Sequence, residues 1–430
     1  MSDTDNLNVE YNYNELLQDE KIHSSVYTDQ RVYEDEMDRI FRAGWVFVCH
    51  DSEVLNAGDY VRRRLGNDEV FAIRGRDGEV SVIENRCAHR GNLICVEEKG
   101  TKKALVCQYH GWAYDTKGTL IDVPYSGGTP KESRCLNLKC LPKVDSYNGF
   151  IFASFNDSVP PLLEHLGRST ELIDRAVGMS PVGKIDLSGG WIKHQLECNW
   201  KMLPESDTDG YHVGFVHKSL AQVIRSNYDS AALEEEKDLK SVTRDWGGGH
   251  VELDFSPAYT KPLEWFGCKE DRYPSYVKAM LEAYGDELGN KKLIDGPPHS
   301  VIFPNLFLGE MTIIIFQPVS STVCLHLHTP LLLEGVDEDV NRRILRQSDG
   351  GVGPCGLFLA DDSVIAERAQ VAIQGKGGWL DLSRGVDRET KNEAGVLVGH
   401  LTDETSNRGF WQHYKTVMTQ APSETSGLAE

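Results

Sequence analysis

The sequence is poor in the features that would place it in a membrane, outside the cell or on a nucleic acid. No apolar run approaches the ~18 residues that a membrane span needs, and residues 1–20 are acidic and polar, without the basic start or apolar segment of an export signal. Basic residues are also scarce, since 45 Lys and Arg stand against 66 Asp and Glu, for a formal net charge of −21. Such a chain repels nucleic acid and anionic membranes. We therefore expect a soluble, cytoplasmic protein with neither kind of partner.

Cysteine is sparse, at ten in 430 residues, which excludes a disulfide-stapled scaffold. Most of the ten are expected to be reduced and buried as small apolar side chains. Cys87 and Cys107 differ, because a histidine follows each of them within three residues. The composition is otherwise that of a globular protein, with 40% hydrophobic residues, and the length suffices for two or three hydrophobic cores.

The first candidate metal site consists of two short arms, Cys87-x-His89 and Cys107-x-x-His110, each followed by a glycine. Two thiolates and two imidazoles can bind Zn²⁺ or a [2Fe–2S] cluster. Segments 69–74, 80–83 and 104–106 are typical of strands, so each arm is expected at a strand end, where the glycine permits a tight loop. A zinc ribbon is the alternative, although ordinary zinc sites use shorter and more regular spacing.

The two arms resemble the Rieske cluster motif. This resemblance implies that Cys87 and Cys107 hold one iron of a [2Fe–2S] cluster and that His89 and His110 hold the other. Respiratory Rieske proteins carry an extra cysteine in each arm, and here the matching positions are Asn92 and Tyr109. The resemblance therefore implies the oxygenase and ferredoxin branch. A stand-alone Rieske ferredoxin, which only carries electrons, is a competing interpretation, but such proteins are much shorter and lack the motif described next.

The second candidate metal site is the pattern Asp209-x-x-His212-x-x-x-x-His217. Histidines five residues apart lie roughly 140° apart on a regular α-helix, so they can share a metal only if the helix breaks or widens between them. Gly214 is placed to allow such a break. From the residues alone, two structural histidines remain the alternative.

Downstream of a Rieske motif, this pattern resembles the mononuclear iron motif of the bacterial Rieske non-haem iron ring-hydroxylating oxygenases. The resemblance implies a facial triad for Fe(II), formed by His212, His217 and a distant carboxylate. Residues 353–356 resemble the Gly-Pro-x-Gly segment that leads into the ligand aspartate, so Asp362 is the expected third ligand, with Asp361 and Glu367 as rivals.

Asp209 has a different role by the same resemblance. It would act in catalysis by bridging His212 to His110 of a neighbouring subunit, which couples the two redox centres through short hydrogen bonds. The alternative is a solvated aspartate before a helical turn. If the bridge exists the protein must be an oligomer, and the family implies a homotrimer or an α₃β₃ assembly with a small β subunit.

The resemblance also implies an α+β fold, with a Rieske-type all-β iron–sulfur domain inserted into a helix-grip (START-like) antiparallel-sheet catalytic domain. We expect an N-terminal helical part of the catalytic domain over 1–44, a Rieske domain over 45–165, the mononuclear iron domain over 166–420 and a disordered tail over 421–430. Apolar runs at 300–308, 312–316 and 321–333 predict an antiparallel meander, and 337–347 and 363–374 predict helices.

The implied function is that of a terminal oxygenase component in the breakdown of aromatic compounds. It would use O₂ to cis-dihydroxylate an aromatic ring at Fe(II), with a monooxygenase or oxidative demethylase as the alternative. Electrons would come from NAD(P)H through a separate reductase, with or without a ferredoxin. Residues 351–356 have the Gly-x-Gly-x-x-Gly spacing, but they follow an expected helix and not a strand, so they do not make a dinucleotide fingerprint.

Segments 377–385 and 402–413 resemble the benzoate- and salicylate-type large subunits, which implies an aromatic carboxylate of the benzoate, salicylate or phthalate type. An uncharged arene is the alternative. A carboxylate substrate calls for a nearby cation, and Arg225, Arg244 and Arg384 are the candidates. The residues expected to line the substrate pocket are Val352, Leu306 and Leu308. Relatives often have Glu-Asn before the iron motif where this chain has Glu205-Ser206, so the hydrogen bonding near iron is expected to differ.

Overall fold

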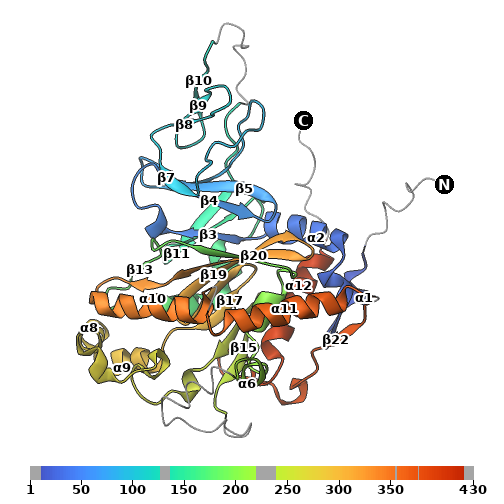
Figure 1. Ribbon diagram of the computed structural model, residues 1–430, viewed down its shortest axis with the longest axis vertical. Helices are drawn as coiled ribbons and strands as arrows, with labels where there is room; N and C mark the ends of the chain where they lie inside the picture. Colours follow the sequence, from blue (N-terminus) through green and yellow to red (C-terminus); the bar gives the residue numbers. More distant parts are fainter. Residues whose placement is uncertain (1–10, 126–135, 219–238, 354–355, 376, 421–430) are drawn as a thin grey trace, which may run out of the picture.

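A computed structural model describes residues 11–125, 136–218, 239–353, 356–375 and 377–420. The expected disordered tail and Arg225 lie outside these residues. Figure 1 shows small sheets and loops at one end of the long axis and a large sheet covered by helices at the other. Among the described helices, none has both the length and the apolar character that a membrane span requires.

The smaller part is built only from strands and loops. A four-stranded antiparallel sheet has the order β6-β5-β4-β7, formed by β4 (Asp59–Leu65), β5 (Asp68–Arg74), β6 (Val80–Glu84) and β7 (Lys99–Thr101). A second sheet of three short strands contains β8 (Leu105–Val106), β9 (Ala113–Tyr114) and β10 (Leu120–Asp122). The strands expected near 69–74, 80–83 and 104–106 are confirmed. β11 (Lys143–Tyr147) and β12 (Phe150–Ser154) complete this part by pairing with β3 (Val46–His50).

The N-terminal segment packs with the second half of the chain. It contains α1 (Tyr13–Leu16), β1 (Leu17–Gln18), β2 (Lys21–His23) and α2 (Gln30–Glu36), which continues into a π-helical stretch over Met37–Arg42. β2 pairs with β22 (Trp379–Asp381), and α1 contacts α12 (Thr405–Thr419). Glu36 is fully buried, where its carboxylate pairs with Lys201 and accepts a hydrogen bond from Tyr414 Oη at 2.6 Å. The paired charges join the two ends of the chain in one core.

The larger part contains a nine-stranded antiparallel sheet with the order β14-β20-β19-β18-β17-β16-β15-β24-β23. Its strands are β14 (Ile192–Leu196), β15 (Val242–Gly247), β16 (His250–Asp254), β17 (His299–Ile302), β18 (Leu306–Gly309), β19 (Thr312–Ser320), β20 (Val323–Pro330), β23 (Thr390–Lys391) and β24 (Leu397–His400). The expected meander is confirmed, because β17 to β20 are consecutive neighbours. The expected strand over 300–308 is two strands, since Pro304, which has no N–H to donate, interrupts it.

Two long helices lie across this sheet (Figure 1). They are α10 (Glu338–Val352) and α11 (Leu359–Ile373), so the first extends five residues beyond the expected end and the second begins four residues before the expected start. Shorter helices are α3 (Leu162–Leu166), α4 (Thr170–Val177), α5 (Met202–Asp207), α6 (Val213–Val216), α8 (Pro274–Tyr284) and α9 (Asp286–Asp295). The part built only from strands lies, along the chain, between the N-terminal segment and the second half, which contain both helices and strands. The expected α+β class is therefore confirmed.

Candidate metal centres and active site

The two cysteine–histidine arms have the same backbone structure. In each arm the cysteine amide donates to the carbonyl five residues later, at 2.8 Å from both Cys87 and Cys107. Gly91 and Gly111, four residues after the cysteines, donate back to the cysteine carbonyls at 2.9 Å. Their φ angles of +74° and +73° lie in the left-handed region that favours glycine. The glycines noted in the sequence therefore close both loops.

The donor atoms of these arms sort into an inner thiol pair and an outer imidazole pair. Cys87 and Cys107 are buried, whereas His89 and His110 are exposed and their Nδ1 atoms lie 3.2 Å apart. The ring of His89 stacks on Trp112 at an interplanar angle of 6°. Burial opposes ionisation of Cys107, but hydrogen bonds from the Tyr109 backbone and from Cys87 lower the pKa of its thiol, which favours a thiolate ligand.

This geometry fits two irons better than one zinc ion. A tetrahedral zinc site needs four donors converging on one point. In the described part of the chain, the one group of three donor atoms that all lie within 4.8 Å belongs to a different site, so the thiols and imidazoles of the arms do not converge on a single ion. Two separate pairs match a cluster in which two cysteines hold one iron and two histidines hold the other.

Cys107→Ala is expected to abolish the visible absorbance of the cluster, because one iron would lose half of its protein ligands. Mononuclear iron, bound elsewhere in the chain, should remain. Cys140→Ala is the matched control, since Cys140 lies on the surface near the same domain's strands. Visible absorption together with iron per chain checks the prediction, and a Cys107→Ala protein with a complete cluster spectrum would contradict it.

The second site forms at the two ends of the short helix α6, where two histidines come together. α6 is a single turn, with His212 at its N-cap and His217 immediately after its last residue. The Nε2 atoms of the two histidines lie 3.3 Å apart. The expected break at Gly214 is wrong: Gly214 lies inside α6, and the chain leaves the helix at His217, whose φ and ψ are −92° and 28°. The helix is too short to keep the two side chains on opposite faces.

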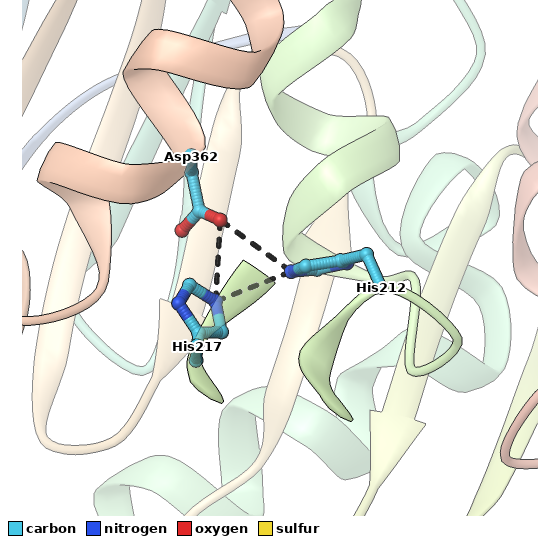
Figure 2. Close-up of side chains that lie close together, drawn as sticks. All are labelled: His212, His217 and Asp362. Atoms are coloured by element: carbon cyan, nitrogen blue, oxygen red, sulfur yellow. Dashed lines mark hydrogen bonds and ion pairs between the residues drawn. The ribbon is translucent and has the colours of Figure 1, made fainter. Parts of the chain in front are cut away.

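Asp362, in the first turn of α11, completes the group shown in Figure 2. Its Oδ1 lies 3.4 Å from Nε2 of His212 and 3.2 Å from Nε2 of His217. This oxygen is buried and has no hydrogen-bond partner among the described residues. Donor atoms held by metal bonds of about 2.1 Å at near-right angles lie about 3 Å apart, so the triangle fits one ion with the opposite face left open. The residues present therefore suit Fe(II).

The rival carboxylates are placed differently. Asp361 has 42% of its side chain exposed, against 11% for Asp362, and its Oδ2 lies 3.8 Å from Nδ1 of His217, on the far side of that ring. Glu367 accepts a hydrogen bond from the amide of Glu197. Asp362 is thus the one carboxylate of the three whose oxygen meets both Nε2 atoms, and its role as iron ligand stays a prediction.

Asp209 lies directly behind the triad. Its Oδ2 is 3.2 Å from Nδ1 of His212, and its Oδ1 accepts a hydrogen bond from the Tyr211 amide at 2.6 Å. A carboxylate on Nδ1 orients the ring so that Nε2 faces the metal position. Burial opposes protonation, but the neighbouring carboxylates of Asp209 and Asp362 raise the pKa of His212 to about 10, which marks a negatively charged site suited to a cation. The bridge to His110 of another subunit remains a prediction.

A cavity of about 660 Å³, counting its open mouth, adjoins the triad. The expected pocket residue Val352 lines it, but the expectation for Leu306 and Leu308 is wrong. Side chains alternate along a strand, and β18 turns Phe307 and Gly309 towards the cavity while both leucines pack into the core on the other face of the sheet. A larger cleft, lined by Arg39, Trp45 and His413 among others, does not include the triad.

Several cavity residues were missed in the sequence. The apolar ones are Val213, Leu253, Phe255, Ile314, Phe358 and Leu359, and the polar ones are Asp207, His299, Glu310 and His326. Ser206, noted in the sequence beside the iron motif, also lines the cavity. Two of the three arginine candidates are engaged elsewhere: Arg244 pairs with Asp254 at 2.8 Å, and Arg384 donates to the Thr402 carbonyl at 2.6 Å. Glu205 is turned away from the triad, towards Tyr27 and Trp411.

Comparisons with known proteins agree with both centres. The family described as "Rieske [2Fe-2S] domain" matches residues 44–142, and the family described as "Ring hydroxylating alpha subunit (catalytic domain)" matches residues 187–420. The chain is 28% identical over 425 residues to the large oxygenase component of the 2,4-dinitrotoluene dioxygenase system of Burkholderia sp. (strain RASC), covering 94% of this chain and 91% of that protein. It is 30% identical over 375 residues to the toluate 1,2-dioxygenase subunit alpha of Pseudomonas putida, covering 84% and 80%.

The same likeness holds in three dimensions. The crystal structure of a naphthalene 1,2-dioxygenase mutant bound to phenanthrene matches with a TM-score of 0.81 at 26% identity, over 96% of both chains.

Proposed function

The chain belongs to the Rieske ring-hydroxylating oxygenase alpha subunits, and we propose that it dihydroxylates aromatic rings that carry no carboxylate group. It is a Rieske non-haem iron dioxygenase that uses a [2Fe–2S] cluster, mononuclear iron and electrons from a separate reductase. When bound, the iron supplies the activation of O₂ beside the ring. The observation that carries the proposal is the triad of His212, His217 and Asp362 facing a largely apolar cavity.

The absence of a carboxylate on the substrate is argued from the charges that line this cavity. Among its described lining residues there is no Lys or Arg, whereas Asp207 and Glu310 both line it. Burial raises the pKa of both Asp207 and Glu310. A further carboxylate in this poorly solvated space would lose its hydration and meet no cationic partner, which is unfavourable. The likeness of segments 377–385 and 402–413 to benzoate- and salicylate-type subunits favours the carboxylate instead. We give more weight to the cavity, because its residues would touch the substrate.

Apolar side chains would bind and orient the ring. Phe307 and Ile314 lie on neighbouring strands of the large sheet, and Phe358 packs edge-on against His217 with ring centroids 5.2 Å apart. These surfaces exclude water and hold an aromatic ring beside the open face of the triad. Phe358 also restrains the ring of His217, whose Nδ1 has no hydrogen-bond partner among the described residues.

The proposed route for electrons runs between subunits. Within one chain the cluster arms lie beside β8 and β9 at one end of the long axis, and α6 lies towards the other (Figure 1). Both His89 and His110 are exposed, and Asp209 is half-buried. A neighbouring copy would set His110 against Asp209, as in a ring of three with or without a small β subunit. Asp209 would then hold the two histidines in a fixed relation across the interface.

A single turnover of reduced, iron-replete protein under ¹⁸O₂ tests the reaction and the substrate charge together. Toluene, naphthalene and benzoate are offered, and products are read by mass spectrometry. We expect two labelled oxygens on toluene or naphthalene and none on benzoate, because the described lining of the cavity offers a carboxylate no cationic side chain. One labelled oxygen would favour the monooxygenase alternative, and a labelled benzoate diol would contradict the argument from the cavity charges.

A further inference from the structure

Three polar side chains outside the triad converge on the same cavity. They are Asp207 at the end of α5, His299 at the start of β17 and Glu310 between β18 and β19. Neither the binding of iron nor the packing of an apolar ring uses any of them. Buried polar groups normally find hydrogen-bond partners, so unpaired ones in a substrate cavity call for an explanation.

Asp207 and His299 are linked, and each keeps one free acceptor. Nε2 of His299 donates to the carbonyl oxygen of Asp207 at 2.7 Å. Because burial lowers the pKa of His299 to about 4, the ring is neutral and its Nδ1 is an acceptor. This Nδ1 and Oδ2 of Asp207 are both buried without a hydrogen-bond partner in the described part of the chain. Burial raises the pKa of Asp207 well above its usual range, and a cationic donor from the substrate would offset that cost and favour the charged carboxylate.

Glu310 is the third acceptor, and the backbone holds it at the cavity under strain. Glu310 and Met311 form the two-residue turn between the paired residues Gly309 and Thr312, with φ angles of 49° and 64°. Such turns favour Asn-Gly, because side chains other than those of glycine, asparagine and aspartate are disfavoured in this region. Met311 is buried, while Glu310 lines the cavity and keeps 42% of its side chain accessible. Strain of this kind concentrates at functional sites.

The spacing of these acceptors suits one nitrogen donor. Oε1 of Glu310 lies 3.9 Å from Nδ1 of His299, too far for a hydrogen bond between them, and a nitrogen about 2.9 Å from each fits between. An ammonium group has three N–H donors, so two can meet Glu310 and His299 while the third stays available to the Asp207 side chain that lines the same cavity. The charge also fits. Burial raises the pKa of both Asp207 and Glu310, and a bound ammonium group would favour their charged forms.

We propose that Asp207, His299 and Glu310 form a subsite for the ammonium group of an arylalkylamine, held beside the ring that the iron site hydroxylates. This inference rests on the proposed function, because it treats the cavity as the substrate site. It also accounts for a cavity that contains carboxylates and, in its described lining, no cationic side chain.

The test compares three ligands that share one ring and differ in charge. Benzylamine, toluene and benzoate are titrated into the anaerobic holoenzyme by calorimetry. A charged hydrogen bond contributes enough for benzylamine to bind about tenfold or more tighter than toluene, and benzoate should bind weakest. Asp207→Asn and Glu310→Gln keep the side-chain shapes, and each should weaken benzylamine about tenfold while changing toluene less than about twofold. Glu282→Gln, on the exposed side of α8, is the control and should change nothing.

The outcomes separate this inference from the proposed function. Benzoate binding as tightly as benzylamine, or benzylamine binding unchanged in Glu310→Gln, would overturn the subsite. Glu310 keeps the test valid if Asp207→Asn does not fold, because its side chain borders open space. Labelled toluene diol under ¹⁸O₂ without any preference for the amine would leave the oxygenase function intact and reject the subsite. Tight, Glu310-dependent amine binding with no labelled product would support the subsite and reject the reaction.

Discussion

Asp362→Asn is expected to remove the mononuclear iron and to lower turnover by more than about 100-fold, since even partners outside the ligand shell typically contribute 10- to 100-fold to metal affinity or activity. Oδ1 of Asp362 lies within 3.4 Å of both ligand nitrogens and has no other partner among the described residues. An amide of the same shape supplies no negative charge to Fe(II). The Rieske cluster should keep its visible spectrum, because its four donors lie on different loops.

The neighbouring aspartate provides the control. Asp361→Asn removes the same charge one residue away, from a side chain that is 42% exposed and 3.8 Å from Nδ1 of His217. The Asp361→Asn protein should keep its mononuclear iron and most of its activity. The measurement is iron per chain after subtraction of the two cluster irons, together with single-turnover product. Loss of iron from Asp361→Asn and retention by Asp362→Asn would reverse the ligand assignment.

The two cluster arms could be predicted from the sequence because the residues that define each arm are close together in the chain. Each arm places a cysteine, a histidine and a glycine within five residues, and the structure gives both arms the same hydrogen bonds and φ angles. The meander from β17 to β20 was also readable, because long apolar runs separated by turns leave few alternatives.

The sequence did not show which face of the sheet each strand residue occupies. All four residues of β18 are buried, so hydrophobicity does not alternate along it and nothing local separates Leu306 and Leu308 from Phe307 and Gly309. Pairing in the sheet decides which residues face the cavity. A one-residue error then assigns the whole strand to the wrong side.

The polar subsite was hidden for a different reason. Asp207, His299 and Glu310 are far apart in the chain, and they meet because α5 contacts β17 while β18 returns antiparallel to it. In the sequence no motif marks any of them: Asp207 lies within a polar run, His299 precedes a strand-like run, and Glu310 lies between two such runs. The signal that was available is the Glu310-Met311 pair between two strand-like runs, where a two-residue turn normally has glycine or asparagine. An unsuitable residue at a tight turn is a reason to look for function there.

Mixed oligomers should recover activity that neither of two inactive chains has alone. Cys107→Ala chains are expected to lack the cluster, and His217→Ala chains to lack the mononuclear iron, so each homo-oligomer should be inactive. If electrons cross between subunits, a cluster in one chain can serve the iron of its neighbour. In a ring of three, every mixed composition contains one such productive interface, so trimers purified through a tag on each chain should show about one third of the wild-type rate.

The position of Asp209 allows a second test in the same mixed oligomers. Asp209 contacts Nδ1 of His212 on the side away from the metal position, so in the mixed ring it matters only in the chain that holds iron. Asp209→Asn added to the Cys107→Ala chain should abolish the recovered rate, whereas the same change in the His217→Ala chain should leave it. Mixed oligomers without activity, in protein shown to contain both centres, would place electron transfer within one chain and remove the argument for the bridge. Equal effects of Asp209→Asn in both chains would assign Asp209 a structural role instead, because a bridge acts at one interface and stability at all of them.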